Sequence, residues 1–236
     1  MSTIWTPHAV SSEASRFRGA IWRMVEAQHI ASTMKIVDSK DEQDLLESLL
    51  EGSKPPLPVG IEDLDYLLAT PFRYDPRRHG SRFRAETDPG VYYGAESVRT
   101  AGAELGYWRW RFLKDAVELD RVEPVAHTAF SVDISTTAID LRQPPFDQDR
   151  AVWTHPADYA GTQAFARVGR QAGIGAIVYE SVRDPEPAWC LALLQPSGFA
   201  MKRPHPGSQT WWLAVNQAEV IWRRDHESMT FYAANW

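Results

Sequence analysis

Cysteine is almost absent from this sequence. Cys190 is the single cysteine among 236 residues, which excludes an internal disulfide and a zinc site built from several cysteines. A chain without disulfides fits a reducing compartment, so we expect a cytoplasmic protein. Long apolar runs are missing as well, since none approaches the roughly 18 residues that cross a bilayer. The first seven residues show no basic segment followed by an apolar one, and we expect no secretory signal.

An excess of positive charge is also missing. The chain holds 25 Lys and Arg against 31 Asp and Glu, a formal net charge of −6. Direct binding to nucleic acid depends on surplus Lys and Arg that neutralise phosphates, so the composition disfavours this class of function. The 44% of hydrophobic and 24% of charged residues are typical of a folded soluble protein. At this length we expect a single domain over residues 1–236.

The common catalytic and nucleotide-binding motifs do not occur. The sequence contains no Walker loop, no Gly-x-Gly-x-x-Gly, no Gly-x-Ser-x-Gly and no His-Glu-x-x-His. The seven histidines include no pair four residues apart, so we expect no metal site. Cys190 lies in an apolar segment, which favours a core residue over a nucleophile.

The apolar residues of the chain follow both helix-like and strand-like patterns. Helical spacing and short apolar or alternating runs are interspersed without a regular strand–helix–strand order, which predicts the α+β class. Helices are expected over residues 41–51, 62–69, 97–114 and 158–172. Strands are expected over residues 20–25, 91–94, 127–141 (one strand or a hairpin), 175–179, 189–194, 211–215, 220–222 and 229–232.

The third expected helix carries a carboxylate beside an apolar stripe. Val98, Ala101, Leu105, Trp108 and Phe112 advance by three and four residues, which predicts one buried helix face. At about 100° per residue along a helix, the Glu104 side chain lies about 80° from the centre of that stripe. Its carboxylate should therefore sit at the edge of the buried face, where it can be partly desolvated.

Four residues form the remaining candidate constellation. Arg82 lies in a turn, Tyr93 follows it by 11 residues and Glu104 follows Tyr93 by 11, while Ser181 lies much later. Each has an ordinary interpretation: a surface arginine, a half-buried strand tyrosine, a solvated helix glutamate and a serine in a turn. Spacing alone does not show that they converge.

In order, spacing and local context, however, the set resembles the RES-domain toxins of bacterial type II toxin–antitoxin systems, a family named for an Arg, a Glu and a Ser. In that family a Gly-x-Arg-aromatic turn leads to a strand ending in Tyr, a helix carrying the Glu and a later Ile-x-Tyr-x-Ser-x-Arg segment. The resemblance covers about residues 22–194 and leaves 195–236 as a C-terminal strand extension. It is most similar to the longer ParT-type ADP-ribosylating branch. The loop over residues 84–90 departs from the family pattern and leaves Tyr92 competing with Tyr93 for the tyrosine role.

The resemblance implies a fold like that of ADP-ribosyltransferase toxins, a split mixed β-sheet with flanking helices and a cleft between its halves. It implies an NAD-dependent transferase without a metal, acting as a toxin on a host protein and restrained by a cognate antitoxin that covers the site. The catalytic positions that match are Glu104, Arg82, Ser181 and Tyr93. The positions expected to bind NAD are Arg82, Tyr92, Tyr93, Arg73, Tyr74 and Arg183.

These residue types suit the chemistry in their own right. Breaking the bond between nicotinamide and ribose creates an oxocarbenium-like centre, which a carboxylate stabilises. An aromatic face suits the nicotinamide ring and a guanidinium suits the pyrophosphate. Two alternatives stay open: an enzyme that destroys free NAD by phosphorolysis or hydrolysis, and a binding module, since the 10 Trp are compatible with a docking surface.

Overall fold

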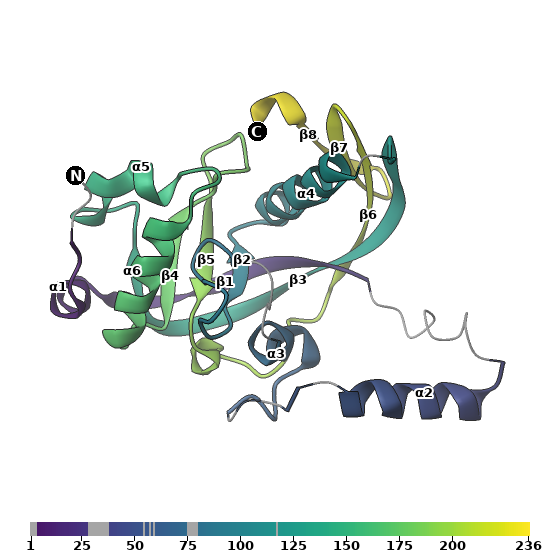
Figure 1. Ribbon diagram of the computed structural model, residues 1–236, viewed down its shortest axis with the longest axis horizontal. Helices are drawn as coiled ribbons and strands as arrows, with labels where there is room; N and C mark the ends of the chain where they lie inside the picture. The colour runs from purple at the N-terminus through teal and green to yellow at the C-terminus, as the bar shows by residue number, and fades with distance from the viewer. Residues whose placement is uncertain are drawn as a thin grey trace.

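The fold is built on one mixed β-sheet with helices packed on it. The computed structural model describes residues 4–27, 38–53, 55–56, 58, 60–74, 80–116 and 118–236. Within these residues, eight strands form a sheet of order β1-β2-β5-β4-β3-β6-β7-β8, flanked by helices (Figure 1). The predicted α+β class is confirmed.

The strands are β1 (Ser15–Glu26), β2 (Tyr92–Ala95), β3 (Arg121–Asp140), β4 (Ala176–Glu180), β5 (Trp189–Leu193), β6 (Gln209–Asn216), β7 (Glu219–Arg224) and β8 (Glu227–Tyr232). The helices are α1 (Pro7–Ser12), α2 (Lys40–Ser53), α3 (Tyr66–Arg73), α4 (Val98–Asp115), α5 (Arg150–Trp153) and α6 (Ala160–Gln171). Every predicted strand is present, and the segment expected as a strand or a hairpin is the single long strand β3.

The sheet divides in two along β3. One edge of β3 pairs with β1, and its other edge pairs with β6 over residues 121–129 and with β4 over residues 138–140. The β3–β4 pairing is parallel and the others are antiparallel, so the sheet is mixed, as expected. In Figure 1, α4 lies with β6, β7 and β8 on one side of this division, and α5 and α6 lie with β4 on the other.

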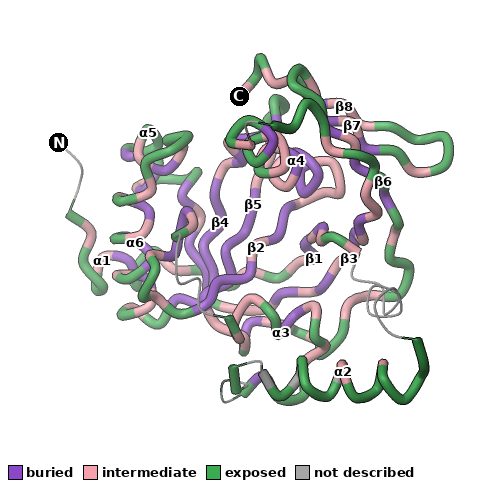
Figure 2. Tube along the Cα trace, turned by 45° about the vertical axis from the view of Figure 1, so that its right-hand side comes forward, coloured by how far each residue is buried: buried purple, intermediate pink, exposed green. Residues whose placement is uncertain are grey.

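The sheet is buried on both faces near this division. Figure 2 shows β2, β4 and β5 as almost continuously buried, which agrees with their short apolar sequences. Successive side chains of a strand point to opposite faces. Tyr92 accordingly packs in one core cluster, with Leu68 of α3, whereas Tyr93 packs against the other, which contains Trp153 and Phe165.

Helix α4 confirms its predicted bounds but not all of its predicted buried face. The Ser97 side chain caps it by accepting from Thr100 N at 3.1 Å. The expected stripe is wrong at its C-terminal end, since Trp108 is 51% and Phe112 57% exposed. Small residues are buried instead, because they let the helix approach β7 closely. A Cβ on Gly106 would lie 2.8 Å from Cγ1 of Val220.

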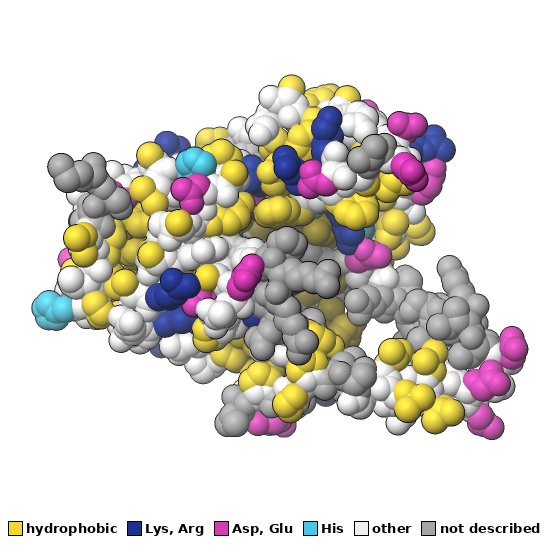
Figure 3. Space-filling view, viewed as in Figure 1, with side chains coloured by type: hydrophobic (Ala, Val, Ile, Leu, Met, Phe, Trp, Pro, Cys, Tyr) yellow, Lys and Arg dark blue, Asp and Glu magenta, His cyan; other side chains and the backbone are white. Residues whose placement is uncertain are grey.

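Helices α2 and α3 also differ from expectation. Helix α2 forms where leucines occur at helical spacing, yet Leu45, Leu49 and Leu50 are 61%, 63% and 47% exposed, and Figure 3 shows a hydrophobic patch over this helix. Helix α3 begins later than predicted because the Asp65 side chain accepts from Leu67 N at 2.9 Å and caps the helix there. Residues 54, 57 and 75–79, where Gly-, Ser- and Pro-rich sequence predicts loops, lie outside the described residues.

Among the described residues, no helix has both the length and the apolar character needed to cross a membrane.

Candidate active site

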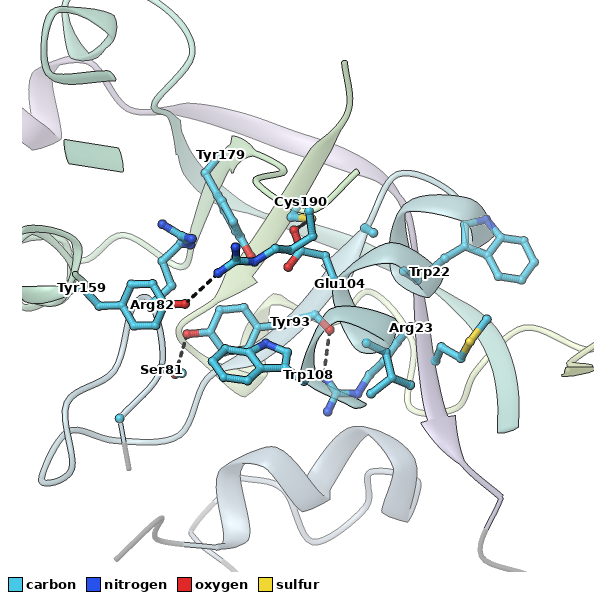
Figure 4. Close-up of a pocket in the computed structure, with 17 residues that line it drawn as sticks. Trp22, Arg23, Ser81, Arg82, Tyr93, Glu104, Trp108, Tyr159, Tyr179 and Cys190 are labelled. Atoms are coloured by element: carbon cyan, nitrogen blue, oxygen red, sulfur yellow. Dashed lines mark hydrogen bonds between the residues drawn. The ribbon is translucent and has the colours of Figure 1, made fainter. Parts of the chain in front are cut away.

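A cavity of about 380 Å³ opens between α4 and the strands β1, β2, β4 and β5 of the sheet. Its volume is within the range of small-molecule sites, about 300–1,000 Å³. Aromatic side chains, three arginines and a single carboxylate are among the residues that line it, and Figure 4 draws the lining residues as sticks. The lining residues come from β1, the turn at residues 80–82, β2, α4, β4 and β5, with Tyr159 and Arg183 from loops.

Glu104 is the carboxylate of this cavity. Its Oε1 accepts a hydrogen bond from the Ser181 hydroxyl at 2.7 Å and a weaker one from the Cys190 thiol at 3.7 Å. Its Oε2 accepts from no other described residue, so this oxygen is available to a ligand. Helix α4 thus places a half-buried carboxylate with one oxygen held and one oxygen free.

Ser181 acts on the cavity through Glu104. It follows β4, is 6% exposed, and its backbone N–H donates to Ala188 O at 2.9 Å. Its Oγ accepts from the backbone N–H groups of Arg183 at 3.3 Å and Asp184 at 3.1 Å. Because two donors occupy the oxygen, the hydroxyl proton is left for Glu104. Ser181 does not itself line the cavity.

Tyr93 fastens the turn that carries Arg82. The Tyr93 hydroxyl forms a 2.7 Å hydrogen bond with the Ser81 hydroxyl and accepts from Phe83 N at 3.0 Å. Burial raises the pKa of Tyr93, so the phenol stays neutral. Its ring lines the cavity while its hydroxyl is fully engaged in fixing the turn.

Two buried arginines converge at one end of the cavity. The Arg82 guanidinium donates to Trp153 O at 2.8 Å and His155 O at 3.0 Å and lies 4.7 Å from the Tyr159 ring. The Arg183 guanidinium lies 3.5 Å from the Tyr107 ring and 3.5 Å from the Tyr159 hydroxyl. Neither forms an ion pair with a carboxylate of the described chain. Buried guanidinium groups without a counter-ion favour an anionic ligand.

Comparison with known proteins identifies the family of this chain. The family model described as RES domain matches residues 57–216, which include Arg82, Tyr93, Glu104 and Ser181. The chain belongs to the RES domain family. It is also similar to a solved chain of the M. tuberculosis MbcT–MbcA toxin–antitoxin complex, with 12% sequence identity and a TM-score of 0.49 over 97% of this chain and 92% of that chain. No curated protein sequence matches it.

Three of the positions expected to bind NAD lie away from the cavity of this RES domain. Tyr92 points to the opposite face of β2, where its ring lies 5.0 Å from that of Phe199. Arg73 ends α3 and donates to Pro55 O at 2.7 Å. The neighbouring Tyr74 is 40% exposed, and its carbonyl accepts from Arg84 at 3.1 Å. Strand alternation explains Tyr92, because Tyr93 takes the face toward the cavity.

The RES domain cavity also contains an arginine that the sequence analysis missed. Arg23 of β1 donates to Tyr93 O at 2.7 Å and lies 4.7 Å from the Tyr92 ring. Its Nε is buried without a hydrogen-bond partner among the described residues, and burial lowers the pKa of this guanidinium. The available signal was a charged residue in the middle of the apolar run 20–25, where burial is costly unless a ligand or partner compensates.

Proposed function

We propose that this RES domain protein is an NAD-dependent ADP-ribosyltransferase that acts as the toxin of a toxin–antitoxin system. The observation that supports this proposal most is the Glu104 carboxylate. One of its oxygens is held by Ser181 at 2.7 Å, and the other is free within a cavity of aromatic rings and guanidinium groups. Family membership adds support, since the matched region contains the same four positions on which the resemblance rests.

The proposed reaction begins at the bond between C1′ of the nicotinamide ribose and the pyridinium nitrogen. This bond breaks with both electrons passing to the nitrogen, so nicotinamide leaves as a neutral molecule and needs no general acid. Positive charge develops at C1′ and the ring oxygen. The free Oε2 of Glu104 stabilises that charge. A preorganised group of this kind typically contributes 10²–10³ in rate.

The rest of the cavity accounts for binding. Arg82 and Arg183 supply positive charge for the pyrophosphate, and Arg23 supplies a further guanidinium on the β1 side. The rings of Tyr93 and Trp108 supply apolar faces for the planar parts of NAD. Ser181 keeps Glu104 oriented and does not contact the substrate in this proposal.

In the second half of the reaction, a nucleophile of a host protein forms a bond to C1′ and loses its proton to solvent. Water or phosphate as the acceptor would instead deplete free NAD. We favour transfer because the strands after residue 195 add surface on which a protein acceptor can bind. A cognate antitoxin that covers the cavity is the partner that the family resemblance implies for a toxin made in its own cell.

The test uses the purified full chain, NAD labelled in its adenylate half and a bacterial lysate. Label on a protein band, together with release of free nicotinamide, is the result expected for ADP-ribosyl transfer. Nicotinamide release without a labelled band would assign the chain to NAD depletion. If neither product appears and NAD does not raise the melting temperature, the NAD assignment is wrong.

A further inference from the structure

A second carboxylate, Asp184, ties together the two segments that carry Glu104 and Ser181. Its Oδ1 accepts from Arg99 Nη2 at 3.1 Å and its Oδ2 accepts from the Thr100 hydroxyl at 3.0 Å. Both partners lie in the first turn of α4, and the Asp184 side chain is only 1% exposed. The start of the helix is therefore fixed to the loop that follows β4.

The same residue also touches the site serine directly. The backbone N–H of Asp184 donates to Ser181 Oγ at 3.1 Å. Asp184 does not line the cavity, so it has no contact with a ligand there. One residue thus holds the Ser181 hydroxyl with its backbone and the helix of Glu104 with its side chain.

The C-terminal strands support this junction from outside. Arg99 lies over the Phe231 ring of β8 at 5.2 Å, and the Trp236 indole donates to Arg183 O at 2.7 Å. Both aromatic residues follow the region that the RES family model matches, which ends at residue 216. These contacts hold Arg99 and the Ser181 loop against each other.

We propose that Asp184 is a positioning residue that sets the Ser181 hydroxyl against Glu104. The Ser181–Glu104 hydrogen bond joins two segments separated by 77 residues in sequence, so it forms only where those segments are held in register. Displacing a reacting group by about 1 Å can cost about 100-fold in rate. The kinetic consequence rests on the proposed NAD reaction, whereas the geometric consequence does not.

The kinetic test is a double-mutant cycle on nicotinamide release by the full chain. Asp184→Asn removes the charge and one acceptor at nearly constant volume. We expect kcat to fall between about 10- and 100-fold with KM for NAD changed less than about twofold. In the Ser181→Ala background the same change should cost less than about twofold, because the bond that Asp184 positions is already gone. An additive loss, or a wild-type rate for Asp184→Asn, would overturn the proposal.

A matched control separates positioning from the general loss of an ion pair. Asp140 accepts two hydrogen bonds from the Arg142 guanidinium, at 2.8 and 2.7 Å, at the end of β3 and outside the cavity. Asp140→Asn should leave kcat within about twofold of wild type. A loss equal to that of Asp184→Asn would show that any broken ion pair has this effect and would overturn the specific role.

A readout independent of activity uses the single cysteine. Cys190 is 2% exposed and lies 3.7 Å from Glu104 Oε1, so its labelling by a thiol reagent under native conditions reports local opening of the pair. Asp184→Asn should label at least about fivefold faster than wild type, and Asp140→Asn should not. Unchanged labelling overturns the positioning role, even if wild type consumes no NAD and the proposed function itself fails. If Asp184→Asn does not fold, Thr100→Val replaces it in both assays with the same expectations.

Discussion

Two short turns at the cavity each contain a serine and an arginine, but the two serines have different roles. In one, Ser81 precedes Arg82 and its hydroxyl bonds the Tyr93 hydroxyl at 2.7 Å. In the other, Ser181 comes two residues before Arg183 and its hydroxyl bonds Glu104 at 2.7 Å. Both arginines are buried and reach the carbonyl groups of residues 153–156.

The difference lies in what each serine leaves unsatisfied. Tyr93 receives a second hydrogen bond from Phe83 N, so its hydroxyl is used entirely in holding the turn. Glu104 keeps one carboxylate oxygen without a partner among the described residues. A satisfied polar network stabilises and orders a fold, whereas an oriented but unsatisfied charge is what stabilises a developing cation. The Ser181 turn should therefore control the reaction, and the Ser81 turn should control stability.

The largest effect should come from the carboxylate itself. Glu104→Gln keeps the shape and an acceptor for Ser181 but removes the negative charge that stabilises C1′ in the proposed reaction. We expect nicotinamide release to fall by at least 10²–10³ while the melting temperature stays near that of wild type. Asp115→Asn, at an exposed carboxylate of the same helix, is the control and should retain wild-type turnover. Near-normal turnover by a folded Glu104→Gln protein would refute the assignment of Glu104.

The comparison of the two turns is tested by removing each hydroxyl. Ser181→Ala frees Glu104 and should lower kcat by about 10- to 100-fold. Ser81→Ala leaves Tyr93 bonded to Phe83 N and should change kcat less than about threefold, with a stability loss of about 1 kcal/mol. Turnover and denaturant unfolding of the two variants measure both effects. Equal losses of kcat in the two variants would contradict the division between the turns.

A smaller effect is expected at Arg82, which we propose binds the pyrophosphate of NAD. Arg82→Ala removes a guanidinium that lines the cavity and should weaken binding of NAD about tenfold, as measured by calorimetry. The change also removes the hydrogen-bond donor of the Trp153 and His155 carbonyls. Arg82→Lys is therefore the companion variant, because it keeps the positive charge. Unchanged NAD affinity in Arg82→Ala would remove this residue from the binding site.

Sequence patterns could predict the elements better than their surroundings. The strands were predictable because β-branched and aromatic runs bounded by Gly and Pro indicate strands without any knowledge of partners. The exposure of Phe112 and of Leu49 was not, because it depends on which distant segment packs against each helix. Gly106 decides this for α4 by admitting Val220, a contact between positions 114 residues apart in the sequence.

The candidate site shows the same limit. Arg82, Tyr93, Glu104 and Ser181 were singled out by their resemblance to a family pattern, while spacing gave no distance between them. Arg23 escaped because no local motif surrounds it, and its place in the cavity arises from the pairing of Trp22 with Ala95. Tyr92 and Tyr93 could have been separated only by knowing which face of β2 the cavity occupies.

The smallest predicted effect separates the cavity from the distant part of the sheet. Burial lowers the pKa of His127, whose Nε2 has no partner among the described residues and whose ring lies 4.9 Å from Trp222. The unfolded chain then binds more protons than the folded one below about pH 6.5, so stability should be full above that pH and fall as the pH drops through the lowered value. Between pH 7.5 and 5.5, wild type should lose about 2–4 °C more in Tm than His127→Phe, the effect of roughly 1 kcal/mol in a domain of this size. His226→Gln, at an exposed histidine of the β7–β8 turn, should keep the wild-type pH dependence. If the Tm of His127→Phe and of wild type changed equally with pH, burial of His127 would not contribute to the loss of stability in acid.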